Sequence, residues 1–147
     1  MILVCVDAFS EFVWLIPVHE ATTMATIKAL KERVFSNFSV PEFLVSDNAR
    51  CFTSHEFQQF CVELGMKHVT KYPSCPQPSH AERFNHNLRA ALILYHGDTH
   101  VTWDQNLTWL QLAFNTANHK ATLATPFEVV FPLVWDHLFY VGGKSKI

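Results

Sequence analysis

The sequence predicts an α/β layer fold, a mixed sheet flanked by helices, and three observations favour it. Short apolar, β-rich runs alternate with longer segments in which apolar residues recur at helical spacing. The chain has 147 residues, which suits a single domain. Its residues are 49% hydrophobic and 16% charged, enough to build a buried core and unlike the composition of a disordered chain.

The first half of the chain predicts, in order, two strands, a helix, a strand, a helix and a strand. The expected ranges are residues 1–6, 12–18, 22–38, 43–46, 54–64 and 66–70. The first two strands form a hairpin around a turn at residues 7–11. Thr22 and Ser54 are N-cap candidates, and Gly65 closes the second helix. The runs 1–6 and 43–46 are apolar apart from Ser46, which is typical of strands buried on both faces.

The second half predicts a loop and three helices. Residues 72–79 contain three prolines and form the loop. The helices are expected at residues 79–95, at residues 103–117 and from Thr125–Pro126 onward, the last with proline at its first position. Large aromatic side chains commonly fill cores. The tryptophans expected in this core are Trp14, Trp103 and Trp109.

Charge and hydropathy limit the classes of function. Eleven Lys and Arg residues against 13 Asp and Glu give a net charge of −2, so any nucleic-acid site must be local. No apolar run approaches the roughly 18 residues that a transmembrane helix needs, and we expect no membrane partner. The four cysteines lack C-x-x-C spacing, which argues against a zinc site or a disulfide framework.

Asp47 and Glu82 are the acidic residues of most interest. Asp47 follows the predicted strand 43–46, and Glu82 lies in the first turn of a helix that can pack beside that strand. Two carboxylates that converge there can hold Mg²⁺, and a pair of such ions can assist phosphoryl transfer. Spacing alone leaves the alternatives open, because aspartate also forms turns and glutamate also favours helix N-termini.

Several motifs resemble the catalytic core of retroviral and Ty3/gypsy-type integrases. In chain order they are VDAFS at residues 6–10, VPE at 40–42, SDNARCF at 46–52, PQ at 76–77 with ERFN at 82–85, and AFNTANH at 113–119 with TPFE at 125–128. The resemblance covers about residues 1–131 and leaves 132–147 as a C-terminal tail. It implies a ribonuclease-H-like sheet and the carboxylate triad called D,D-35-E, with Asp47 as the second member and Glu82 as the third.

The chain departs from the family pattern in three places. Ala49 stands where the family has a glycine that permits positive φ, so we expect a shifted loop at Asp47. Only 34 residues separate Asp47 from Glu82. In the family, the first catalytic aspartate lies on a central strand upstream of VDAFS. We therefore expect this sheet to lack that strand, Asp7 to be a turn residue, and the neighbouring strand edges to be open to pairing or aggregation.

The resemblance further implies DNA as the partner, Mg²⁺ or Mn²⁺ as the cofactor of the complete enzyme, and a homodimer or larger oligomer. Integrases hold DNA largely through phosphate contacts, for which polar residues near the carboxylates are candidates. These are Asn48, Lys71, Tyr72, Gln77, Arg83, Asn85 and Arg89. The complete enzyme would process 3′ ends and transfer DNA strands, whereas this chain alone is expected to be inactive. Its expected location is nuclear, or cytoplasmic for a non-functional fragment.

Two other hypotheses stay open. The chain could be a non-catalytic descendant, either a domesticated nucleic-acid-binding module or a decayed remnant. A cellular ribonuclease H would share the fold, but the S-D-N and E-R-F-N motifs favour the integrases.

Overall fold

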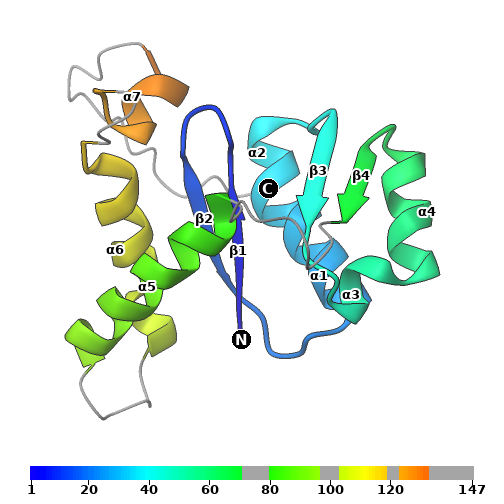
Figure 1. Ribbon diagram of the computed structural model, residues 1–147, viewed down its shortest axis with the longest axis horizontal. Helices are drawn as coiled ribbons and strands as arrows, with labels where there is room; N and C mark the ends of the chain where they lie inside the picture. The colour runs from blue at the N-terminus through cyan, green and yellow to red at the C-terminus, as the bar shows by residue number, and fades with distance from the viewer. Residues whose placement is uncertain (71–79, 97–102, 119–122, 133–147) are drawn as a thin grey trace, which may run out of the picture.

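A computed structural model describes residues 1–70, 80–96, 103–118 and 123–132 (Figure 1). In chain order, its elements are β1 (Ile2–Val6), β2 (Val13–Pro17), α1 (Thr23–Ala29), the π-helix η1 (Leu30–Phe35), α2 (Ser36–Phe38), β3 (Phe43–Ser46), α3 (Arg50–Thr53), α4 (His55–Glu63), β4 (Lys67–Thr70), α5 (His80–His96), α6 (Trp103–Thr116) and α7 (Pro126–Val130). The predicted order of strands and helices is confirmed. None of the described helices is long and apolar enough to cross a bilayer.

The predicted hairpin is confirmed. β1 and β2 pair antiparallel, with Ile2 opposite Pro17 and Val6 opposite Val13. Asp7 lies in the turn between them, where its Oδ2 accepts hydrogen bonds from the backbone N–H of Ser10 at 2.9 Å and from its hydroxyl at 2.6 Å. Asp7 is therefore the turn residue that the sequence predicted.

β2 contributes to two hydrophobic cores, one on each face. Successive side chains of a strand point to opposite faces, so Val13 and Leu15 face one way and Trp14 and Ile16 the other. The first pair packs with Leu88 of α5 and with Leu107 and Leu110 of α6. The second pair belongs to a core with residues of α1, η1 and α4, including Ile27, Leu30, Phe57 and Phe60. The hairpin thus lies between the two groups of helices (Figure 1).

Helix α6 covers the outer edge of β2 with side-chain amides. The Oδ1 of Asn115 accepts from the Val13 N–H at 2.8 Å, and its Nδ2 donates to the Val13 carbonyl at 2.9 Å. Gln111 Oε1 accepts from the Leu15 N–H at 2.8 Å. Edge strands expose unpaired backbone groups that invite further pairing. These two amides therefore cap the edge of β2 in place of another strand.

β3 and β4 form a separate, parallel sheet in which Phe43 pairs with Lys67 and Ser46 with Thr70. β1 and β3 do not pair with each other, and they line an open cavity of about 1310 Å³ together with residues of η1 and α2. Among the described residues, no strand lies between β1 and β3. This arrangement agrees with the expectation of a mixed sheet that lacks its central strand.

The prediction that residues 1–6 and 43–46 are buried on both faces is wrong. Phe43 and Val45 are 57% and 53% exposed, and Leu3 is the one fully buried residue of β1. An apolar run is buried on both faces only when strands and helices surround it. Here residues of β1 and β3 line the open cavity, so part of their side-chain surface stays exposed.

The helix limits follow the predicted caps. Thr22 Oγ1 accepts from the Ala25 N–H, Ser54 Oγ accepts from the Phe57 N–H, and Gly65 has a φ of +70°. Thr125 and Glu128 form a capping box at α7, with Pro126 at its first position. These caps depend on nearby residues, which is why the sequence predicts them.

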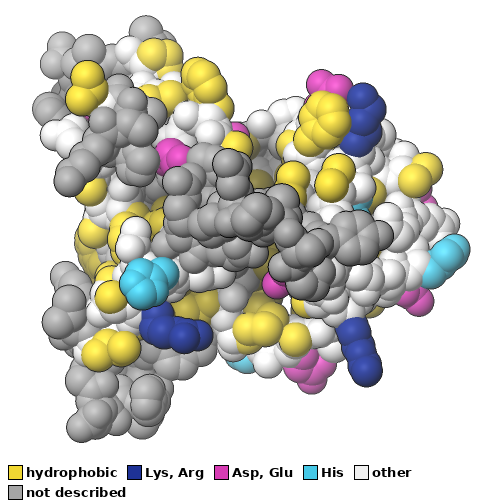
Figure 2. All heavy atoms as spheres, viewed as in Figure 1, with side chains coloured by type: hydrophobic (Ala, Val, Ile, Leu, Met, Phe, Trp, Pro, Cys, Tyr) yellow, Lys and Arg dark blue, Asp and Glu magenta, His cyan; other side chains and the backbone are white. Residues whose placement is uncertain are grey.

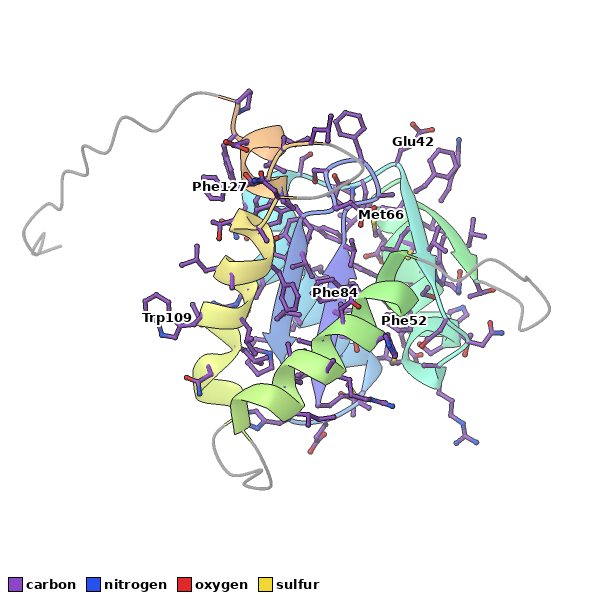
Figure 3. All side chains as sticks on the ribbon, turned by 60° about the vertical axis from the view of Figure 1, so that its left-hand side comes forward. Glu42, Phe52, Met66, Phe84, Trp109 and Phe127 are labelled. Carbon is purple, nitrogen blue, oxygen red and sulfur yellow. The ribbon has the colours of Figure 1, made fainter. Side chains whose placement is uncertain are left out.

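Four features of the helices differ from expectation. The helix over residues 22–38 contains the π-helical stretch η1, and a short helix α3 precedes α4. Leu64 follows Phe57, Phe60 and Cys61 at helical spacing, which predicts a buried position, but it is exposed. Trp109 is 68% exposed and points away from the sheet in Figure 3, because it lies on the face of α6 opposite Leu107 and Leu110. Trp14 is buried as predicted, and the side chain of Trp103 lies outside the described part.

Candidate metal and nucleic-acid site

Asp47 is the first residue after β3, as the sequence predicted. Its Oδ1 accepts from the Ala49 N–H at 3.0 Å, which closes a tight turn before α3. Ala49 has a φ of −61°, an ordinary value that alanine adopts without strain. Ala49 thus does not adopt the positive φ that a glycine would permit, and the shift of the loop stays a prediction. The carboxylate of Asp47 is exposed and lies at the margin of the cavity.

A chain of hydrogen-bonded side chains lies beneath Asp47, and its members Gln58 and His68 were not among the residues predicted from the sequence. His68 Nε2 is 2.9 Å from Ser46 Oγ, and His68 Nδ1 is 2.9 Å from Gln58 Nε2. The Ser46 hydroxyl donates to the backbone carbonyl of Asp47 at 2.9 Å. Burial lowers the pKa of His68 from its ordinary value. Predicting this group from the sequence would have required the register of β3 on β4, which brings together Ser46 and His68, 22 positions apart.

Glu82 lies in the first turn of α5, also as predicted. Its side chain is outside the described part, but Asn85, three residues later in the same helix, lines the cavity that Asp47 lines. Helix α5 packs over β1, and its Phe84 meets Phe114 of α6 edge to face at 4.7 Å (Figure 3). The beginning of α5 and the end of β3 therefore border one cavity.

The remaining predicted residues fall into three groups. Asn48 and Arg89 are exposed, the first in the turn after Asp47 and the second one helical turn beyond Asn85. Arg83 lies in α5, with a side chain outside the described part. Lys71, Tyr72 and Gln77 lie wholly outside the described residues. Of the predicted residues, the structure thus brings Asp47 and Asn85 to one cavity.

The donor set at Asp47 fits part of a magnesium site. Mg²⁺ prefers oxygen ligands and keeps several waters, so an exposed carboxylate with one oxygen held by a backbone amide is a suitable ligand. No group of three or more His, Cys, Asp or Glu side chains gathers anywhere in the described part of the chain. Asp7 lines the same cavity, but β1 and β3 run in opposite directions, so Asp7 and Asp47 lie at opposite ends (Figure 1).

The described surface carries no continuous basic face in the view of Figure 2. Lys and Arg side chains appear there as separate groups between apolar and acidic ones. Two of the lysines are also engaged elsewhere, since Lys67 Nζ is 3.2 Å from Glu42 Oε1 and Lys31 Nζ lies over the ring of Phe60. In this view, positive charge is therefore present only in small separate groups.

Comparison with known proteins identifies the family. The sequence matches the family described as "Integrase core domain" over residues 1–76, just over half of the chain. It is 33% identical over 131 residues to the Pro-Pol polyprotein of Feline foamy virus, and 30% identical over 131 residues to the Transposon Tf2-3 polyprotein of Schizosaccharomyces pombe. Each alignment covers 88% of this chain, which spans only 11% and 10% of those relatives.

Solved structures agree with this assignment. The catalytic core domain of HTLV-2 integrase, in complex with magnesium and in a trimeric form, has a TM-score of 0.71 and 25% identity. The alignment covers 87% of this chain and 82% of that one. A dimeric form of the same core has a TM-score of 0.70, with 26% identity and coverage of 88% and 83%. The fold is the ribonuclease-H-like fold of integrase cores, and the chain belongs to the integrase core domain family.

Proposed function

We propose that the chain forms part of the catalytic core of an enzyme that integrates the DNA of a retrovirus-like or gypsy-like element. The observation that carries the proposal is the cavity bordered by Asp47 at the end of β3 and by Asn85, three residues after Glu82 in α5. Residues three apart in a helix lie on one face. The relatives support the proposal because they include a transposon polyprotein and an integrase core described in complex with magnesium.

In this proposal, Asp47 and Glu82 hold Mg²⁺ or Mn²⁺. The bound metal would stabilise the attacking and leaving oxygens during phosphoryl transfer. The Ala49 N–H fixes one oxygen of the Asp47 carboxylate, so the side chain is oriented before a metal binds. Exposed Asn48, Asn85 and Arg89 donate hydrogen bonds to DNA phosphates, together with Lys71, Tyr72, Gln77 and Arg83.

We also propose that residues 1–147 alone do not join DNA. Integrase chemistry uses three carboxylates, and no group of three or more His, Cys, Asp or Glu side chains gathers among the described residues. Robust metal-dependent strand transfer by the isolated chain would contradict this part of the proposal.

Metal binding at Asp47 is the direct test. Titrating Mn²⁺ into the ¹⁵N-labelled chain should broaden the amide signals of Asp47, Asn48 and Ala49 first, because paramagnetic broadening falls steeply with distance. Asp47→Asn should abolish this selective broadening, since it removes the charged ligand. Asp7→Asn is the matched control: it changes a carboxylate on the same cavity but at its other end, and it should leave the broadening unchanged.

A DNA-binding measurement separates the catalytic proposal from the non-catalytic module. Fluorescence anisotropy with a labelled duplex should show salt-dependent binding that Arg89→Ala weakens equally for different sequences. Binding of DNA without any Asp47-dependent response to Mn²⁺ would refute the catalytic proposal and favour the non-catalytic module.

We further propose that the chain self-associates through the outer helices. Trp109 and Leu112 of α6 and Ile93 of α5 are large apolar side chains that remain exposed. The HTLV-2 core is described in trimeric and dimeric forms. Sedimentation velocity should show a concentration-dependent oligomer, and Trp109→Glu should shift it toward the monomer. An oligomer that Trp109→Glu leaves unchanged would exclude this surface.

A further inference from the structure

The side chains beneath Asp47 are brought together by strand pairing. β3 and β4 are parallel, with Leu44 opposite His68 and Ser46 opposite Thr70. Ser46 is therefore the diagonal neighbour of His68, a separation that a ring side chain can bridge. Gln58 reaches the other side of the ring from α4. Three separate elements thus meet directly below the turn that carries Asp47.

The direction of each hydrogen bond follows from chemistry. Gln58 Nε2 lies 3.2 Å from the carbonyl of Phe52, which can only accept, so this atom is the donating nitrogen. It also donates to His68 Nδ1, which must then be unprotonated, and the ring proton lies on Nε2. His68 Nε2–H donates to Ser46 Oγ, leaving the hydroxyl proton for the Asp47 carbonyl. Each hydrogen bond of this network is thus donated toward Asp47: from Gln58 to His68, from His68 to Ser46, and from Ser46 to the Asp47 carbonyl.

The imidazole is held in place by packing as well as by hydrogen bonds. Its ring meets the fully buried ring of Phe57 edge to face, with centroids 5.2 Å apart. Burial also lowers the pKa of His68, so the neutral ring that this network needs is the stable form at neutral pH. A neutral imidazole with a fixed tautomer orients the Ser46 hydroxyl through a hydrogen bond and forms no ion pair with Asp47.

Asp47 is consequently held at two points. Its backbone carbonyl accepts from the Ser46 hydroxyl, and its carboxylate accepts from the Ala49 N–H. We propose that His68 is a positioning residue for Asp47, holding the Ser46 hydroxyl so that the turn and its carboxylate keep one orientation. That this orientation serves metal binding rests on the proposed function, whereas the positioning of Asp47 by His68 does not.

The variants separate hydrogen bonding from packing. His68→Leu keeps an apolar side chain against Phe57 but removes both hydrogen bonds. His68→Gln keeps them, because its Nε2–H can donate to Ser46 and its Oε1 can accept from Gln58. Ser46→Ala removes the hydroxyl with little change of volume, which keeps the test decisive if His68→Leu folds poorly. His55→Leu, an exposed histidine at the start of α4, is the matched control.

The first measurement is the solvent-exchange rate of the Ala49 amide, read by NMR magnetisation transfer in the full chain. His68→Leu and Ser46→Ala should speed this exchange about fivefold or more, whereas His68→Gln and His55→Leu should leave it within about twofold. The amides of Lys67 and Val13, bonded to Glu42 and Asn115, serve as references for general loosening. An unchanged Ala49 rate, or a rise matched by both references, would overturn the proposal.

The second measurement is the Mn²⁺ concentration at which the Asp47 amide signal is half broadened. His68→Leu should raise it several-fold, and His68→Gln should restore it. If the wild-type chain shows no Asp47-dependent broadening, the proposed metal site fails, while the exchange rates still decide whether His68 positions Asp47. If the wild-type chain responds and His68→Leu responds equally, the positioning role fails and the metal site stands.

Discussion

Replacing Asn115 tests how the edge of β2 is stabilised. Its side chain is 2% exposed and makes two hydrogen bonds to the backbone of Val13. Asn115→Leu keeps a similar volume but leaves a buried N–H and a buried C=O without partners. Each such group costs about 1–3 kcal/mol, so we expect the two together to lower the free energy of unfolding by about 2–6 kcal/mol. A typical domain has only about 5–15 kcal/mol in total.

Urea unfolding followed by tryptophan fluorescence measures this loss, since buried Trp14 neighbours Val13 in β2. Two further variants provide losses of stability with which that of Asn115→Leu is compared. Gln111→Leu breaks one hydrogen bond at a half-buried site and should cost about 1 kcal/mol. Asn118→Leu changes an exposed asparagine just beyond α6 and should cost less than about 0.5 kcal/mol. The reasoning is refuted if Asn115→Leu and Asn118→Leu lower stability equally.

Three other predictions concern packing and pH. Phe57→Ala empties a fully buried site and should cost about 3–5 kcal/mol by urea unfolding, whereas Phe9→Ala, at an exposed ring, should cost less than about 0.5 kcal/mol. Burial holds the pKa of His68 in the folded chain below the unfolded value of about 6.5. The stability that neutral His68 contributes is therefore complete above about pH 6.5 and is lost as the pH falls through the folded pKa. Urea unfolding of the wild-type chain and His68→Gln across this range should show a smaller loss for the variant. The pKa of Glu128 is lowered by a hydrogen bond from the Thr125 backbone and, to a smaller extent, by one from the Thr125 side chain. The stability from this capping box is therefore complete above the pKa that Glu128 has in the unfolded chain, and it is lost as the pH falls through the pKa of Glu128 in the folded chain. An NMR titration should show Thr125→Ala raising the pKa of Glu128 toward its ordinary value.

Features that depend on neighbouring residues were predictable from the sequence. Thr22 and Ser54 begin helices because each hydroxyl meets an amide only three residues away. Gly65 ends α4 because it tolerates a φ that other residues resist. Asp47 could be placed at a strand end for the same reason, since the apolar run before it and the polar turn after it are contiguous.

Features that depend on distant partners were not predictable in this way. The exposure of Phe43 and Val45 is decided by which elements surround β3, and the apolar run alone cannot specify that. Trp109 was expected in the core because of its residue type, but the rotation of α6 about its axis places Leu107 and Leu110 there instead. His68 acquires its partners only through the register of β3 on β4. Its local sequence carries no corresponding signal.

The side-chain amides that cap β2 can form their hydrogen bonds only late in the synthesis of the chain. Val13 and Asn115 are 102 positions apart. A ribosome adds roughly 5–20 residues per second, so the hairpin emerges about 5–20 s before the helix that completes its edge. During that interval, the backbone groups of Val13 and Leu15 remain open to other partners. During the synthesis of the residues between β2 and α6, this edge of the hairpin therefore lacks the side-chain amides that cover it in the folded chain.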